Sequence, residues 1–251
     1  MPQPDSKRVS RDRYDAVLFD LDGVVTDTAS VHATCWKQMF DEYLRKRASQ
    51  RGEAFCPFDL ATDYRLYVDG KPRFDGVRDF LASRGIQLPE GNPDDPAEVE
   101  TVCGLGNRKN DLVNHVIADV GVETYEGTVR FIHQLRRNGF KIAVVTSSQN
   151  CTVVLKAAKL DDLFEAQVDG NTIHARRLAG KPAPDTFLLA AKLLGAEPIR
   201  TVVIEDAISG VQAGVKGKFG LVIGIARKGN AEELKHHGAH LVVDDLAELL
   251  D

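Results

Sequence analysis

The segment Ala16-Val-Leu-Phe-Asp-Leu-Asp-Gly23 joins a short apolar run to two carboxylates and a glycine. The apolar part, Ala16–Phe19, is typical of a buried strand in a parallel sheet. Side chains two residues apart share a face of an extended chain, so Asp20 and Asp22 can both point into one crevice. Gly23 permits a sharp turn directly after them. The segment therefore predicts a strand whose end carries a pair of acidic groups.

After residue 121 the chain alternates between apolar strands and helical patterns. Strands with intervening helices imply right-handed crossovers and a parallel sheet covered on both faces. The predicted fold class is therefore α/β, with a doubly wound, Rossmann-like parallel-sheet core. The predicted strands are 141–145, 201–204, 220–225 and 240–243, and the predicted helices are 125–138, 150–160, 184–194, 207–215 and one between the last two strands.

The region between the first strand and residue 121 shows apolar stripes at helical spacing and requires no strand. The stripes run through Trp36–Leu44, Val77–Leu81 and Leu112–Val120. We therefore predict an α-helical domain inserted after the first strand. The expected division is a mobile N-terminus at 1–13, an α/β core at 14–30 and 122–251, and a helical domain at 31–121.

Composition excludes several classes of protein. The 251 residues are 43% hydrophobic, which is enough for a sizeable core, and the net charge of −5 disfavours nucleic-acid binding. Residues 1–13 are polar, unlike a signal peptide, and no apolar run approaches the ~20 residues that span a bilayer. Cys35, Cys56, Cys103 and Cys151 form no close Cys-x-x-Cys pair, so we expect reduced thiols. We predict a cytoplasmic monomer that binds neither nucleic acid nor membrane.

Residues just after the strands should lie together, because ligands of such sheets bind beyond the carboxyl ends of the strands. Acidic groups at two strand ends favour a hard cation such as Mg²⁺, and Lys181 is a candidate for a second positive charge. This set of groups suits phosphoryl transfer. One carboxylate can attack phosphorus, a second carboxyl group can transfer a proton, and the cations can neutralise the phosphate. The alternative is a set of turn aspartates and a solvated lysine, but four separate segments agree in type and order. The strand-end residues are Asp20, Asp22, Thr146, Ser147, Ser148, Glu205 and Asp206.

Four segments of the chain resemble the four motifs of the haloacid dehalogenase superfamily, and the helical insert resembles its cap domain. Within the superfamily, the chain is similar to the β-phosphoglucomutase-like subfamily through Thr26-Asp-Thr28, His32, Trp36 and Arg108-Lys-Asn-Asp111. The four segments are Phe19–Thr28, Thr146–Ser148, Lys181–Asp185 and Glu205–Asp206.

The resemblance implies a role for each residue of the core motifs. Asp20 would be the nucleophile and Asp22 the general acid and base. Thr146 and Lys181 would hold the transferring phosphate. The resemblance also implies a Mg²⁺ site made by Asp20, the backbone carbonyl of Asp22, and Asp206, with Glu205 close by.

The cap residues have competing interpretations. By spacing alone His32 is a packed histidine on an apolar stripe, but the resemblance makes it a catalytic residue that links cap closure to Asp22. Arg73, in Asp69-Gly-Lys-Pro-Arg73, is either a grip on a phosphate or a solvated arginine at a helix start. Lys109 is either a substrate contact or a surface lysine. Further substrate contacts implied by the resemblance are Thr28 near the hinge, Ser147, Ser148 and Asn150.

The resulting functional prediction is a Mg²⁺-dependent phosphomutase. It would interconvert β-glucose 1-phosphate and glucose 6-phosphate through a phospho-aspartate and a bisphosphate. The alternative is a phosphatase acting on a hexose or trehalose phosphate, and a third possibility is a non-catalytic binding protein. Asp69, Gln149 and Ala207 stand where mutases of this group carry lysine, lysine and serine, which leaves the exact sugar phosphate open.

Overall fold

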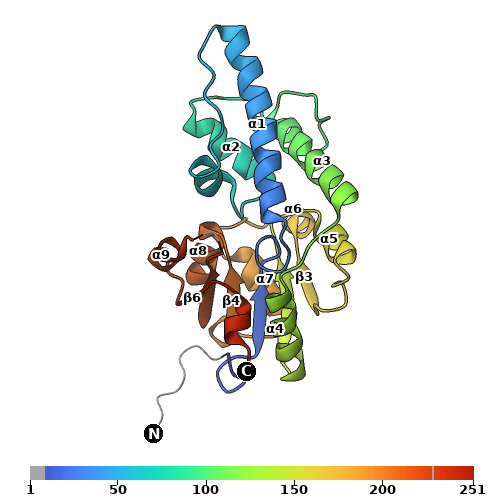
Figure 1. Cartoon of the computed structure of the whole chain (residues 1–251), viewed down its shortest axis with the longest axis vertical. Helices are drawn as coiled ribbons and strands as arrows, with labels where there is room; N and C mark the ends of the chain where they lie inside the picture. Colours follow the sequence, from blue (N-terminus) through green and yellow to red (C-terminus); the bar gives the residue numbers. More distant parts are fainter. Residues whose placement is uncertain (1–8, 228) are drawn as a thin grey trace. The chain divides into compact units, whose positions relative to one another are not determined.

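The computed structural model describes residues 9–227 and 229–251. The chain divides into two compact units, one formed by Met1–Asp27 and Glu123–Asp251 and the other by Thr28–Val122. We call them the core unit and the cap unit, and Figure 1 labels their elements. Of the N-terminal segment 1–13, residues 1–8 lie outside the described part, and Ser10 accepts hydrogen bonds from the backbone amides of Arg13 and Tyr14.

The core unit contains a six-stranded sheet in the order β3-β2-β1-β4-β5-β6. Every neighbouring pair of strands is parallel, which confirms the predicted α/β fold class. β1 and β4 lie at the centre, and their side chains are fully buried. The strands are β1 Ala16–Phe19, β2 Lys141–Val145, β3 Ala166–Val168, β4 Thr201–Glu205, β5 Leu221–Ile225 and β6 Leu241–Val243.

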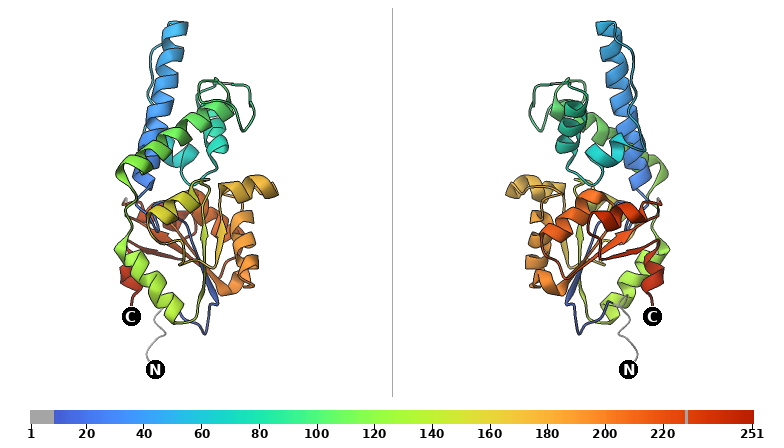
Figure 2. Two further views of the ribbon diagram at one scale, coloured as in Figure 1. Left: turned by 90° about the vertical axis from the view of Figure 1, so that its right-hand side faces the viewer. Right: turned by 90° about the vertical axis from the view of Figure 1, so that its left-hand side faces the viewer.

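Helices cover the sheet on both faces, with α4 and α7 on opposite sides in Figure 2. One face packs Leu18 and Ala143 against Phe187 of α7 and Val211 of α8 in a single apolar cluster. The helical segments of the core unit are α4 Glu126–Arg137, α5 Cys151–Ala157, α6 Gly170–Arg176, α7 Asp185–Leu193, η2 Pro198–Arg200, α8 Ile208–Lys216, α9 Ala231–His236 and η3 Leu246–Leu249.

Among the strands and α-helices of the core, β3 and α6 were not predicted from the sequence, and neither were the short 3-10 helices η2 and η3. β3 is only three residues long and has Gln167 at its centre, so its apolar run is too short to stand out. α6 spans seven residues and begins at Gly170, a poor helix former. Asp169 caps this helix by accepting a hydrogen bond from the backbone amide of Thr172, at 2.8 Å.

The cap unit consists of helices and loops: α1 Ala29–Arg51, the short π-helix η1 Tyr64–Val68, α2 Arg73–Ser83 and α3 Val102–Val120. An aromatic cluster fills its core. The Phe40 ring lies 5.2 Å from the Trp36 ring, 5.1 Å from Phe58 and 4.2 Å from Phe80, measured between centroids. These rings join α1, α2 and the segment between them.

None of the four cysteines forms a disulfide. Within the described ranges, no helix is both long and apolar enough to cross a membrane.

We predict that Phe40→Ala destabilises the cap unit by about 3–5 kcal/mol, because it removes a fully buried ring from the aromatic cluster. Trp36 is the single tryptophan of the chain, so urea unfolding followed by its fluorescence reports on the cap. Phe55→Ala is the matched control, because Phe55 is 38% exposed, and it should change stability by about 0.5 kcal/mol or less. Equal urea midpoints for the two variants would contradict the packing argument.

Candidate active site

The site lies at the carboxyl ends of the central strands β2, β1 and β4. Phe19 of β1 is in register with Val144 of β2 and Ile204 of β4. The residue after Phe19, Asp20, donates its backbone amide to the carbonyl of Ile204 at 3.0 Å. The register therefore brings Asp20 beside Glu205, and the order of the strands makes this the switch point of the sheet, where ligands bind.

Lys181 occupies the centre of this cluster. Its Nζ lies 2.5 Å from Asp20 Oδ1, 2.5 Å from Glu205 Oε1 and 3.2 Å from the carbonyl oxygen of Val145. The lysine side chain is completely buried. Burial alone lowers the pKa of Lys181, but the charges of Asp20 and Glu205 outweigh it and raise that pKa above its ordinary value. Lys181 is therefore a fixed positive charge that orients both carboxylates.

An acidic cluster beside Lys181 has the chemistry of a hard-cation site. Asp20, Glu205 and Asp206 are all buried and offer carboxylate oxygens within 4.8 Å of one another. Burial raises the pKa of Asp20 well above its ordinary value, against the opposing charge of Lys181, so a further cation would stabilise the ionised form. Oxygen ligands of this kind fit Mg²⁺. Glu205 already accepts hydrogen bonds from Lys181 and from the amide of Ala207 at 2.9 Å, so both of its carboxylate oxygens have protein donors.

The second carboxylate of the first motif, Asp22, contacts the loop that follows β2. Thr146 Oγ1 donates to Asp22 Oδ2 at 3.1 Å and accepts from the amide of Ser148 at 3.0 Å. Ser148 Oγ in turn accepts from the amide of Asn150 at 3.1 Å. The structure thus brings together the predicted residues Asp22, Thr146, Ser148 and Asn150, and Ser147 lies in the same loop.

The turn after Asp22 depends on Gly23. Its φ of +95° is a backbone conformation that residues with a side chain rarely adopt. A Cβ built on Gly23 would lie 2.1 Å from Asp206 Oδ2, so the turn passes directly against the acidic cluster. Glycine is required here for both its conformation and its size.

In the cap unit, His32 and Lys109 contact each other. Lys109 Nζ lies 2.7 Å from His32 Nδ1 and 4.9 Å from the centroid of the Trp36 ring. Lys109 is only 5% exposed, so its interpretation as a surface lysine is wrong. Lys109 lies on the buried face of α3, and its ammonium group is compensated there by the ring nitrogen of His32 and the aromatic face of Trp36, both on α1. Thr28, at the start of the cap unit, is buried and accepts the backbone amide of His32 at 2.9 Å.

Arg73 begins α2 and is half-buried, so it is not the solvated arginine of the alternative interpretation. Its Nη2 donates to Asn107 Oδ1 at 2.7 Å, and its guanidinium lies 4.8 Å from the centroid of the Phe74 ring. Burial lowers the pKa of Arg73. Asn107 therefore holds one edge of the guanidinium in a defined orientation.

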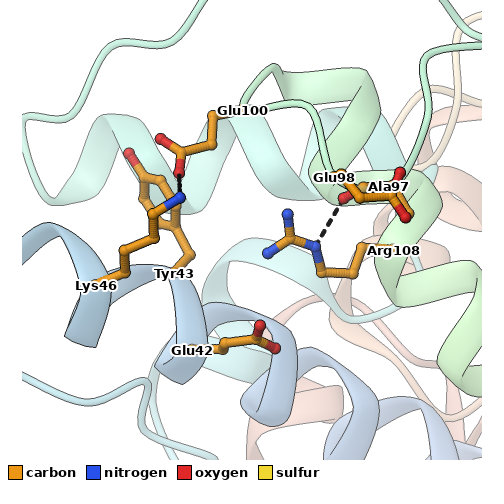
Figure 3. A pocket seen from close by; sticks show the side chains of 7 residues that line it. All are labelled: Glu42, Tyr43, Lys46, Ala97, Glu98, Glu100 and Arg108. Carbon is orange, nitrogen blue, oxygen red and sulfur yellow. Dashed lines mark hydrogen bonds and ion pairs between the residues drawn. The ribbon is translucent and has the colours of Figure 1, made fainter.

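A hollow of about 400 Å³ elsewhere in the cap unit contains none of the predicted site residues. Its lining has three carboxylates against two cations, which disfavours a phosphate ligand. Figure 3 shows Lys46 paired with Glu100 at 2.5 Å and Arg108 bonded to the carbonyl of Ala97 at 2.8 Å. The lining residues are Glu42, Tyr43, Lys46, Ala97, Glu98, Glu100 and Arg108.

Comparison with known proteins agrees with this geometry. Residues 14–217 match the family model of the haloacid dehalogenase-like hydrolases. The chain belongs to this haloacid dehalogenase-like family. It is 53% identical over 238 residues to a β-phosphoglucomutase of Mycobacterium tuberculosis, covering 94% of this chain and 91% of that protein. It is 32% identical to a β-phosphoglucomutase of Bacillus subtilis, covering 93% and 91% of the two chains.

The solved structures include a β-phosphoglucomutase from Clostridium difficile with a TM-score of 0.73 and 26% identity, covering 94% of this chain and 93% of that one. These relatives confirm both parts of the predicted resemblance, to the haloacid dehalogenase superfamily and to its β-phosphoglucomutase-like subfamily. The chain is accordingly an enzyme of this family.

Arg227 is a residue near the family motifs that the sequence analysis missed. Its Nη1 donates to the carbonyl oxygen of Gly23 at 2.7 Å. The available signal was its position two residues after β5, at another strand end of the same sheet edge.

We predict that Gly23→Ala lowers Mg²⁺ affinity about 10–100-fold, because the new methyl group displaces Asp206 and strains the turn. Isothermal titration with Mg²⁺ measures this directly. Gly52→Ala is the matched control: Gly52 also has a positive φ, of +66°, but a Cβ there meets nothing within 4 Å. Equal Mg²⁺ affinity for the two variants would contradict the assignment of Asp206 to the metal site.

Proposed function

We propose that this enzyme is a Mg²⁺-dependent phosphomutase that interconverts β-glucose 1-phosphate and glucose 6-phosphate. The observation that carries the proposal is the buried arrangement of Asp20, Lys181 and Glu205 beside the Asp22–Thr146 pair. The similarity to β-phosphoglucomutases over nearly the whole chain supports the choice of substrate.

In the proposed reaction, Asp20 is the nucleophile. One of its carboxylate oxygens attacks phosphorus, the bond from phosphorus to the sugar oxygen breaks, and the departing oxygen takes a proton from Asp22. The products are an acyl phosphate on Asp20 and the free sugar hydroxyl. Lys181 neutralises charge on the transferring group, and the Thr146 hydroxyl, which donates to Asp22 in this structure, turns its proton to the phosphate when substrate binds. A bound Mg²⁺ held by Asp20, the carbonyl of Asp22 and Asp206 would supply further positive charge, with Glu205 close by.

A mutase differs from a phosphatase in the acceptor of the acyl phosphate. The mutase returns the group to a sugar phosphate, through a bisphosphate intermediate, whereas the phosphatase gives it to water. We propose that Arg73, oriented by Asn107, binds the second phosphate of that sugar, because a guanidinium matches phosphate geometry. Ser147, Ser148 and Asn150 are the proposed contacts from the core unit, and Thr28, His32 and Lys109 those from the cap unit. A hexose or trehalose phosphatase is the second candidate, favoured by Gln149 where mutases carry lysine.

We predict that Asp20→Asn lowers turnover on the order of 1,000-fold or more, because an amide cannot attack phosphorus. The assay follows glucose 6-phosphate and free phosphate from β-glucose 1-phosphate, with Mg²⁺ and a trace of glucose 1,6-bisphosphate. In the wild-type protein, glucose 6-phosphate should form much faster than phosphate; the reverse would favour the phosphatase. The control is Asp15→Asn, because Asp15 directly precedes the first residue of β1, at the end of the strand opposite to Asp20. Similar activities of the two variants would refute the assignment of Asp20 as the nucleophile.

We predict that Arg73→Ala lowers kcat/KM for the sugar phosphate about 10–100-fold, which corresponds to the loss of a charged hydrogen bond. Hydrolysis of a small aryl phosphate should change much less, because that substrate has no second phosphate. Arg78→Ala, on the same helix but exposed and paired with Glu90, is the matched control. Equal losses for both substrates would argue against a role of Arg73 in binding the second phosphate.

A further inference from the structure

The loop that carries the two catalytic carboxylates is closed by its own backbone on one side. The carbonyl of Leu21 accepts the amides of Val25 and Thr26 at 2.9 and 3.0 Å, and the amide of Gly23 donates to the carbonyl of Thr26 at 2.8 Å. These bonds satisfy the inner groups of the turn. The carbonyl of Gly23 instead accepts a hydrogen bond from outside the turn.

Arg227 is the donor to that carbonyl, and both terminal nitrogens and the face of its guanidinium make further contacts. Its Nη1 lies 2.7 Å from Gly23 O, and its Nη2 lies 2.9 Å from Asp245 Oδ2 and 3.4 Å from Thr128 Oγ1. The guanidinium carbon lies 3.6 Å from the centroid of the Tyr125 ring, which is stacking distance. Its side chain is only 18% exposed.

The groups that hold Arg227 are themselves fixed, Tyr125 and Thr128 to the chain that leaves the loop and Asp245 to η3. Tyr125 donates its backbone amide to the carbonyl of Val25 at 3.1 Å and its hydroxyl to Asp27 Oδ1 at 2.7 Å. Thr128 Oγ1 donates to the carbonyl of Val24 at 2.8 Å. Asp245 Oδ1 caps η3 through the amide of Ala247 at 2.8 Å, which leaves its other oxygen for Arg227.

The pair between Arg227 and Asp245 is only partly buried, and an ion pair that solvent can reach contributes little to stability, so this pair alone would not explain the arrangement. A charge-assisted bond to the carbonyl of Gly23 has a geometric consequence, because it fixes the Gly23–Val24 peptide unit, one residue beyond Asp22. Small displacements of a catalytic group cost much of its rate contribution. We propose that Arg227 is a positioning residue that holds the Gly23 turn and thereby aims Asp22 at the leaving group. This inference rests on the proposed role of Asp22 as the general acid.

The test compares two esters that differ in their need for a proton. The leaving group of 4-nitrophenyl phosphate departs readily as an anion, whereas that of phenyl phosphate benefits more from a general acid. We expect Arg227→Ala to lower kcat/KM for phenyl phosphate about 10-fold more than for 4-nitrophenyl phosphate. The readout is the ratio of the loss in kcat/KM for phenyl phosphate to the loss for 4-nitrophenyl phosphate. Arg227→Lys keeps a cation near Gly23 but loses the planar stack, so its ratio should lie between those of the wild type and Arg227→Ala. If Arg227→Ala does not fold, as judged by circular dichroism, Arg227→Lys carries the test by itself.

Two reference variants make the outcomes distinguishable. Asp22→Asn should show the largest ratio, and Arg200→Ala should match the wild type, because Arg200 pairs with Asp15 near the start of β1. A raised ratio in Asp22→Asn with wild-type ratios in both Arg227 variants would overturn the positioning role alone. A wild-type ratio in Asp22→Asn would overturn the acid role of Asp22, and the inference with it. Neither ester is a sugar phosphate, so failure of the enzyme on β-glucose 1-phosphate would count against the mutase and not against Arg227.

Discussion

The buried ammonium group of Lys181 is the constraint around which the site is arranged. A lysine with no exposed side-chain surface is costly unless its charge is compensated, and here Asp20 and Glu205 compensate it at 2.5 Å each. The two carboxylates come from adjacent central strands, so the same contacts tie β1 to β4 at their carboxyl ends. Removing the lysine would leave two buried carboxylates facing each other. The stability of this part of the core and the orientation of the proposed nucleophile therefore depend on one side chain, that of Lys181.

The sheet determines which residues can share that environment. Because β1 lies between β2 and β4, whatever follows these three strands meets at one edge, however far apart it is in sequence. Asp22 and Thr146 are 124 residues apart and still form a hydrogen bond. Arg227 reaches the same turn from β5, one strand further along. The residues after the first, second and fourth strands supply the proposed carboxylates and the threonine, the loop between α6 and α7 supplies Lys181, and the segment after the fifth strand supplies Arg227.

The central strands were predictable because each combines an apolar run with a polar residue at its end, and this also located the core site. β3 was not predicted, because three residues with a central glutamine show no hydrophobic periodicity. Helix α3 begins at Val102, ten residues before the predicted stripe. Its first turns were not recognised because they contain Gly104 and Gly106, which are poor helix formers. Gly106 is required by packing, since a Cβ there would lie 2.7 Å from the Phe74 ring. The burial of Lys109 was missed because sequence spacing does not reveal a partner 77 residues away, His32.

The chemistry proposed for the core residues allows phosphoryl transfer either to water or to a sugar, because neither the proposed attack on phosphorus nor the proposed proton transfer by Asp22 depends on the acceptor. Selectivity between the two must come from groups that bind the remainder of the sugar phosphate. Arg73 is suited to this because Asn107 and Phe74 already hold its guanidinium, so less conformational entropy is lost on binding a phosphate. With Gln149 in place of a lysine, the loop that follows β2 in the core unit offers one cation fewer for a phosphate. The proposed mutase activity therefore places more of the second phosphate's binding energy on Arg73 than it would in a protein with both cations.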